Sequence, residues 1–176
     1  MSVGHSSDML REDVTAPEFE LSGIDGPGDE GDDSYEFREF VLSELLEDGP
    51  VLLAFYPGDF SPACTEELCS LRDLHFEAVG GSATVYGISR DTLFTHEAFA
   101  YGHDLQFPLL SDVRGDVCRA YDAVHETDFG GGVEAGLPKR TVYVVDADRT
   151  IRYVWQTDDP YEQPEFEPAL GALSAD

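Results

Sequence analysis

The pattern of apolar and polar positions along the chain alternates between the period of a strand and the period of a helix. Continuous apolar runs at residues 51–56 and 83–89 predict two buried strands, and strict alternation at residues 16–21 predicts an edge strand. Two further runs joined by the turn sequence Asp-Ala-Asp-Arg predict a hairpin. The full set of predicted strands is 16–21, 51–56, 83–89, 107–110, 141–145 and 151–155.

Stretches with helical spacing separate these strands. Residues 37–46 place phenylalanine, valine and leucine at intervals of three and four, which predicts a short amphipathic helix. Strands that alternate with helices and end in a hairpin predict an α/β domain of three layers. The other predicted helices are 62–76, 92–103, 115–121 and 164–173, and the predicted loops are 26–33 and 122–136.

The chain of 176 residues is long enough for one domain with a substantial core. We expect this domain to span residues 15–176, behind a polar and aperiodic tail at residues 1–14. The start of the chain lacks the basic and apolar regions of a signal peptide, and no apolar run approaches membrane-spanning length. Three cysteines do not make an extracellular disulfide framework, so we expect a reducing cytoplasm.

The net charge adds a further constraint. Ten basic residues stand against 37 acidic ones, which gives −27, and Lys139 is the one lysine of the chain. A field of that sign repels nucleic acid and anionic membranes, so neither is expected as a partner. Because the acids are spread along the whole sequence, a surface adapted to molar salt is favoured over an acidic patch for a basic partner.

One strand-to-helix junction carries candidate chemistry. The apolar run 51–56 ends at Pro57, and Ser61-Pro62 is typical of a helix start, with serine at the N-cap and proline in the first turn. Cys64 then falls in the first helical turn, where free backbone N–H groups and the helix dipole favour an anion. A thiol placed there loses its proton more easily, and the thiolate is the nucleophile. We therefore interpret Cys64 as an activated cysteine.

Pro57, Ser61 and Cys64 form a Pro-x3-Ser-x2-Cys motif that resembles the active-site signature of the peroxiredoxins, in which threonine often stands at the serine position. The next residues, Cys-Thr-Glu-Glu-Leu-Cys-Ser-Leu-Arg-Asp, resemble the bacterioferritin-comigratory-protein or Q-type branch. In that branch a second cysteine often lies five residues after the first, as Cys69 does here. The likeness extends over residues 16–173 and implies a thioredoxin-like fold, with a central mixed β-sheet flanked by helices and an N-terminal strand or hairpin extension.

The same resemblance implies a thiol-dependent peroxidase that reduces hydrogen peroxide and alkyl hydroperoxides without a metal or an organic cofactor. Cys64 would attack the O–O bond and become a sulfenic acid, which Cys69 would condense to a disulfide within one chain. A thioredoxin- or glutaredoxin-like reductant would reopen that disulfide, and the protein would be a monomer or a weak homodimer.

A peroxidase also needs hydrogen-bond donors for both peroxide oxygens and a cation beside the sulfur. Ser61 offers a hydroxyl, and Pro57 would shield the pocket and fix the loop backbone. Arg140 matches the family's arginine at the start of a late strand, and its guanidinium stays charged and presents two donors. The alternative interpretation of Arg140 is an arginine at the exposed end of a strand, and the motif context favours the active site.

Three other interpretations stay open. Cys64 and Cys69 could hold a metal, although no Cys-x2-Cys pair completes a tetrahedral site and the histidines are scattered. A disulfide reductase would carry Cys-x2-Cys at the helix start, and this chain does not. The third is a non-catalytic thioredoxin-fold redox-sensing or interaction domain, in which Cys69 is a small buried hydrophobe. Cys118 is interpreted as structural, with a resolving role as the alternative. The histidines, at 5, 75, 96, 103 and 125, are interpreted as surface or hydrogen-bonded residues.

Overall fold

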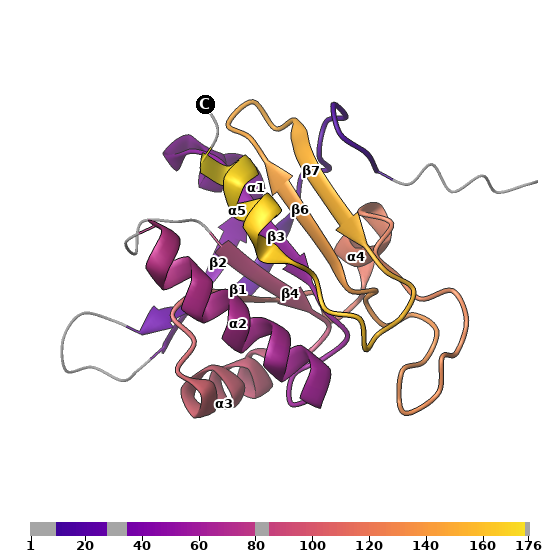
Figure 1. Ribbon diagram of the computed structural model, residues 1–176. Helices are drawn as coiled ribbons and strands as arrows, with labels where there is room; N and C mark the ends of the chain where they lie inside the picture. The colour runs from indigo at the N-terminus through magenta and orange to yellow at the C-terminus, as the bar shows by residue number, and fades with distance from the viewer. Residues whose placement is uncertain (1–9, 28–34, 80–84, 175–176) are drawn as a thin grey trace, which may run out of the picture.

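A computed structural model of the protein describes residues 10–27, 35–79 and 85–174. Over these residues a seven-stranded mixed sheet forms the middle layer, in the order β2-β1-β5-β4-β3-β6-β7 (Figure 1). The strands are β1 (Glu20–Pro27), β2 (Tyr35–Val41), β3 (Val51–Phe55), β4 (Val85–Ser89), β5 (Leu109–Ser111), β6 (Thr141–Val145) and β7 (Ile151–Gln156).

Helices cover both faces of this sheet and enclose two core clusters. On one face lie α2 (Pro62–Val79), α3 (Leu93–His103) and α5 (Phe166–Ser174). On the other face lie α1 (Leu42–Leu45), the short 3-10 helix η1 (Leu46–Asp48) and α4 (Asp116–Ala120). The prediction of a three-layer α/β domain with a central mixed sheet is therefore confirmed.

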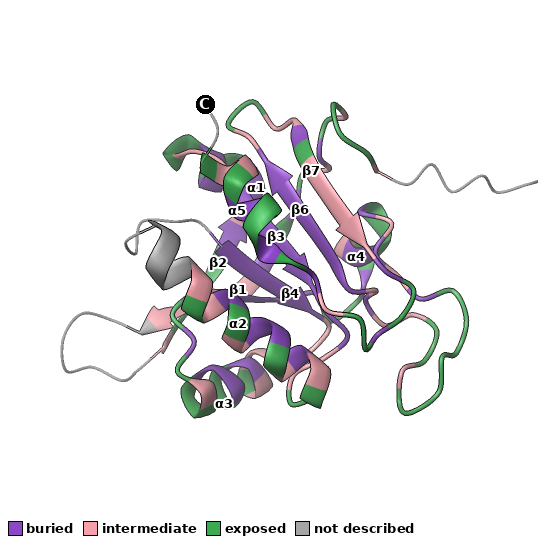
Figure 2. Ribbon diagram, in the orientation of Figure 1, coloured by how far each residue is buried: buried purple, intermediate pink, exposed green. Residues whose placement is uncertain are grey.

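The central strand β3 is buried along its whole length (Figure 2). Because successive side chains of a strand point to opposite faces, Leu52 and Ala54 join the cluster under α2, whereas Leu53 and Phe55 join the cluster under α4. β3 runs parallel to β4 and antiparallel to β6. The end of β3, the end of β4 and the beginning of β6 therefore meet at one edge of the sheet, where Phe55 pairs with Thr141.

Two predictions near the N-terminus are wrong. The predicted edge strand at 16–21 begins later, as β1, and it lies between β2 and β5 rather than at the edge. The predicted helix at 37–46 is a strand over its first half, because β2 pairs antiparallel with β1 and only its last residues turn into α1. Residues three apart face opposite sides of a strand, and Phe40 is buried while Phe37 is 45% exposed.

The other predicted elements agree with the structure to within a few residues, and the described stretch 122–136 has isolated β-bridges but no helix or strand. Most of the predicted acidic loop, residues 28–33, lies outside the described residues, as do residues 1–9 of the predicted tail.

The last residues of the predicted tail are hydrogen-bonded to β7. The backbone N–H of Asp13 donates to the Ile151 carbonyl, and the N–H of Ile151 donates to the Val14 carbonyl. The domain limits of 15 and 176 stay a prediction. None of the described helices is long and apolar enough to cross a membrane.

Candidate active site

The turn between β3 and α2 brings the predicted motif to the edge of the sheet where β3 ends. Pro57 is buried two residues after the end of β3, and Ser61 precedes the first residue of α2. The Ser61 Oγ accepts a long hydrogen bond of 3.5 Å from the Cys64 N–H, and the Ser61 carbonyl accepts one of 2.8 Å from the Thr65 N–H. Ser61 is therefore the N-cap of α2, which places Cys64 in the first turn as predicted.

Arg140 lies against Cys64, and both side chains are fully buried. Arg140 immediately precedes β6, whose first residue, Thr141, pairs with Phe55 at the end of β3. This pairing places Arg140 next to the turn that follows β3. Its Nη2 donates to Cys64 Sγ at 3.3 Å and to the Pro160 carbonyl at 2.6 Å. A guanidinium that donates to the sulfur stabilises the negatively charged thiolate.

Glu67 completes this buried cluster, and sequence reasoning missed it. Its Oε2 accepts from Arg140 Nη1, while its Oε1 has no hydrogen-bond partner among the described residues. Burial raises the pKa of Glu67 to about 7, against the opposing effect of Arg140. The available signal was spacing, because residues three apart share one helix face and Glu67 follows Cys64 by three.

The segment between β7 and α5 covers the start of α2. The Gln163 side-chain amide donates to the Ala63 carbonyl at 2.9 Å, and the Pro160 carbonyl accepts from Arg140. Inside the segment, the Thr157 hydroxyl donates to the Glu162 carboxylate at 2.5 Å. Cys64 consequently has no exposed surface, although its helix begins at the surface of the domain.

A second buried network, also missed from the sequence, holds the turn itself. Asp59 accepts from the Tyr56 hydroxyl at 2.6 Å through Oδ1, and its Oδ2 lies 2.7 Å from His96 Nδ1. The Asp59 N–H donates to Asp91 at 2.9 Å. His96 Nε2 faces the Leu110 carbonyl at 3.1 Å, and because a carbonyl only accepts, this nitrogen carries a proton.

These bonds tie the turn to the ends of β4 and β5. Phe60, the residue after Asp59, has a φ of +65°, a left-handed conformation that costs a non-glycine residue about 1–3 kcal/mol. Its ring packs on Phe99 with centroids 5.1 Å apart. The strained turn therefore depends on Asp59, which precedes the N-cap Ser61 by two residues. His96 is a hydrogen-bonded histidine, as interpreted from the sequence. One possible metal-ligand atom from each of Asp59, Asp91 and His96 lies within 4.8 Å of the other two.

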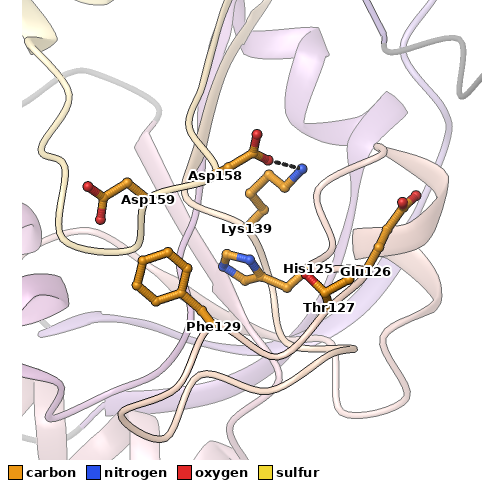
Figure 3. A pocket seen from close by; sticks show the side chains of 7 residues that line it. All are labelled: His125, Glu126, Thr127, Phe129, Lys139, Asp158 and Asp159. Atoms are coloured by element: carbon orange, nitrogen blue, oxygen red, sulfur yellow. Dashed lines mark ion pairs between the residues drawn. The ribbon is translucent and has the colours of Figure 1, made fainter.

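A pocket of about 480 Å³ is lined by residues of the stretch 125–129, by Lys139, and by Asp158 and Asp159 (Figure 3). Figure 3 shows the Lys139 ammonium directed at Asp158, 2.7 Å away, with the Phe129 ring near His125. Burial lowers the pKa of His125, and the charge of Lys139 lowers it further. None of the five predicted site residues lines this pocket.

The structure brings together four of the five predicted site residues, namely Pro57, Ser61, Cys64 and Arg140. The fifth, Cys69, is half-buried further along α2, and Cys64 and Cys69 are both free thiols within one continuous helix. Cys118 is buried in the cluster on the opposite face of the sheet from Cys64.

Comparisons with known proteins identify the family to which this chain belongs. The sequence profile of the AhpC/TSA family matches residues 13–154. A putative peroxiredoxin of Coxiella burnetii, named bcp, is 34% identical over 140 residues, which covers 80% of this chain and 84% of that protein. The crystal structure of the peroxidoxin BcpB from Mycobacterium tuberculosis matches with a TM-score of 0.72 and 32% identity, over 93% of this chain and 96% of that one.

A third relative comes from a plant: the chloroplastic peroxiredoxin Q of Triticum aestivum is 39% identical over 106 residues, 60% of this chain and 46% of that protein. A thioredoxin-like sheet with a cysteine–arginine pair at a helix start defines a thiol-based oxidoreductase. The chain belongs to the AhpC/TSA family, and within it to the Q-type branch of the peroxiredoxins, which are thiol-dependent peroxidases.

Proposed function

We propose that Cys64 is the peroxidatic cysteine and that it acts on hydrogen peroxide and small alkyl hydroperoxides. The observation that carries this assignment is the buried contact of 3.3 Å between Arg140 Nη2 and Cys64 Sγ in the first turn of α2. The thiolate attacks one peroxide oxygen in line, the S–O bond forms and the O–O bond breaks. The leaving alkoxide or hydroxide takes up a proton, and Cys64 becomes a sulfenic acid.

Three groups around the sulfur have distinct roles in this proposal. Arg140 presents fixed N–H donors to the thiolate and to the negative charge that develops on the leaving oxygen. The Ser61 hydroxyl donates to or accepts from the peroxide. Pro57, buried at the end of β3, keeps water out of the site and fixes the backbone of the turn.

The burial of Cys64 supports small substrates. No part of the residue is exposed, and the segment that carries Pro160 and Gln163 lies over it. Hydrogen peroxide and short alkyl hydroperoxides require less displacement of that segment than a bulky hydroperoxide does.

We assign Cys69 as the resolving cysteine. Both thiols lie in α2, and five residues of ideal helix separate their Cα atoms by roughly 8.6 Å. A disulfide needs about 4.4–6.8 Å, so the first turns of α2 unwind after oxidation. Cys118 is disfavoured, because it lies across the sheet and because burial and the Asp112 carboxylate raise its pKa far above the usual range. A thioredoxin-like reductant then reopens the disulfide.

Intact mass after one equivalent of peroxide tests both assignments. Wild type and Cys118→Ser are expected to lose two hydrogens, which reports an internal disulfide. Cys69→Ser is expected to gain oxygen without a disulfide, and Cys64→Ser to stay unchanged. Peptide mapping should locate the bridge between Cys64 and Cys69, and hydrogen exchange over residues 63–71 should be faster in the oxidised protein. A bridge to Cys118 would show that the resolving cysteine is wrongly assigned.

We also propose that the protein works as a monomer or weak homodimer in the cytoplasm of a salt-adapted cell. The support is the charge of −27 on 176 residues, which makes the folded chain repel itself until salt screens it. The melting temperature should rise from low to molar potassium chloride. A melting temperature that does not change with salt would contradict this setting.

A further inference from the structure

The cluster of Cys64, Arg140 and Glu67 contains two acids and one cation, and all three residues are fully buried. Arg140 contacts both acids, through Nη1 to Glu67 and through Nη2 to Cys64. The carboxylates on the segment between β7 and α5 and on α5 itself are all exposed, namely Asp158, Asp159, Glu162, Glu165 and Glu167. Among the described residues, Arg140 is the cation that offsets the charge of Glu67.

Charge counting limits the protonation states of this cluster. If Cys64 and Glu67 are both ionised, the buried cluster carries one uncompensated negative charge, in a chain whose net charge is already −27. An uncompensated buried charge is strongly unfavourable, whereas one added proton makes the cluster neutral. When Cys64 is a thiolate, the available position for that proton is Glu67.

The hydrogen bonds identify the oxygen that carries it. Glu67 Oε2 accepts from Arg140, so this oxygen is occupied as an acceptor. Glu67 Oε1 is buried and has no partner among the described residues. A carboxylate would leave a negatively charged oxygen unpaired there, whereas a carboxylic acid leaves a neutral hydroxyl, whose burial costs much less.

We propose that Glu67 holds one proton while Cys64 is a thiolate and releases it when Cys64 is oxidised. This proposal rests on the peroxidase function proposed above. The S–O bond forms and the O–O bond breaks, so the sulfur loses two electrons to the peroxide. The leaving hydroxide takes the proton of Glu67 and becomes water. The sulfenic acid is neutral, and Glu67 is then the anion that pairs with Arg140, so the cluster is neutral before and after the reaction.

In this scheme Glu67 affects the Cys64 thiolate through Arg140 and the charge balance, and it affects the leaving hydroxide by giving up its proton. It is a positioning and proton-holding residue rather than the nucleophile. The reaction is then distinguished by its proton balance. Oxidation of Cys64 takes up no proton from solvent, because Glu67 supplies the proton that turns hydroxide into water.

The test is a proton count during a single oxidation. The background is Cys69→Ser, which stops the reaction at the sulfenic acid, with and without Glu67→Gln. One equivalent of hydrogen peroxide is added in weak buffer containing a pH indicator, near pH 6.5. The thiolate content before addition is measured from its ultraviolet absorbance, because a protonated thiol would also take up no proton.

The expected uptake per Cys64 thiolate oxidised is close to none with Glu67 and about one proton in the Glu67→Gln protein. Glu66→Gln is the matched control, since Glu66 is the adjacent exposed glutamate, and its uptake should equal that of the Cys69→Ser background. An uptake of about one proton with Glu67 present would overturn the proposal. So would the absence of Cys64 thiolate at this pH.

A second measurement needs no change at Glu67. The infrared difference spectrum between oxidised and reduced Cys69→Ser should show the loss of the carbonyl band of a protonated carboxyl group. An unchanged carboxyl region would also overturn the proposal. If no sulfenic acid forms in any of these proteins, the peroxidase function itself fails, and this outcome is separate from a wrong proton count.

Discussion

Two cysteines of this chain occupy the same position of two different helices. Cys64 is the third residue of α2, Cys118 is the third residue of α4, and both are fully buried. The two lie on opposite faces of the sheet. By helix position and burial alone, they would be equivalent candidates for a nucleophile.

Their charged neighbours are opposite in sign. Cys64 accepts from Arg140, whereas Cys118 lies beside Asp112, whose carboxylate accepts the Cys118 N–H at 2.8 Å. Burial raises the pKa of Cys118 far above the usual range, and the negative charge of Asp112 raises it further. The start of a helix therefore does not make a thiolate by itself. We therefore expect the charged neighbour, rather than the helix position, to decide which of the two thiols reacts.

The largest difference should appear when each cysteine is removed. Cys64→Ser is expected to abolish peroxide consumption with a dithiol as reductant, without loss of the fold. Cys118→Ala removes one buried sulfur and should cost roughly 1 kcal/mol of stability while activity is retained. If Cys64→Ser retained most of the activity, the assignment of Cys64 rather than Cys118 as the reactive thiol would be refuted.

The next largest effect should come from the compensating cation. Arg140→Met removes the donor to Cys64 Sγ and should slow the second-order oxidation of Cys64 by roughly 10²–10³-fold, which is the usual effect of losing a fixed donor to developing charge. Arg140→Lys keeps the charge but not the paired donors, so it should recover part of the rate. Stopped-flow kinetics with hydrogen peroxide measures the oxidation rate of both variants. An unchanged rate in Arg140→Met would show that the contact between Arg140 and Cys64 does not contribute to oxidation.

A pair of buried aspartates separates positioning from stability. Asp59→Ala releases the turn before Ser61 and should slow oxidation of Cys64 by roughly 10–100-fold, because small misplacements of reacting groups have effects of that size. Asp112→Ala removes the acceptor at the start of α4 and should cost about 1–3 kcal/mol of stability, with oxidation intact.

The alkylation of Cys64 by iodoacetamide serves as the internal control in these aspartate variants, since it needs a thiolate but no aligned donors. The ratio of oxidation to alkylation should fall in Asp59→Ala, stay constant in Asp112→Ala, and recover in Asp59→Asn. The asparagine can still accept from Tyr56 and donate to His96. Equal ratios in all three variants would remove Asp59 from the set of positioning residues.

The last effect concerns stability and pH. The pKa of Glu67 is raised from 4.5 to about 7, so the folded state binds this proton more tightly than the unfolded chain does. The stabilising contribution is complete below about pH 4.5 and is lost as pH rises through about 7, with a total of roughly 3 kcal/mol. The unfolding free energy of wild type minus that of Glu67→Gln should fall over this range. A difference that is constant with pH would contradict the raised pKa.

The local part of the site could be predicted from the sequence. Pro57, Ser61 and Cys64 lie within eight residues, and the proline and the capping serine fix the start of α2 by short-range rules. The position of Arg140 depends on the pairing of β6 with β3, and the resemblance to a family supplied it where periodicity did not.

The remaining site residues could not be predicted because their roles exist only in the folded chain. Asp59 and His96 are 37 residues apart, and neither belongs to a motif. Glu67 resembles its exposed neighbour Glu66 until the packing of α2 on the sheet buries one and leaves the other in water. In the same way, phenylalanines with helical spacing became the strand β2 because β1 offered a partner for pairing.

The complete enclosure of Arg140 has a consequence for the choice of oxidant. Its positive charge is satisfied inside the protein by Cys64 and Glu67, and the surface that an approaching molecule meets belongs to a chain of net charge −27. Uncharged hydrogen peroxide diffuses through this field unaffected. A hydroperoxide that carries a carboxylate should be repelled, so its rate of reaction is expected to rise with ionic strength while that of hydrogen peroxide stays constant. We therefore expect the acidic exterior to select among oxidants before any of them reaches the sulfur.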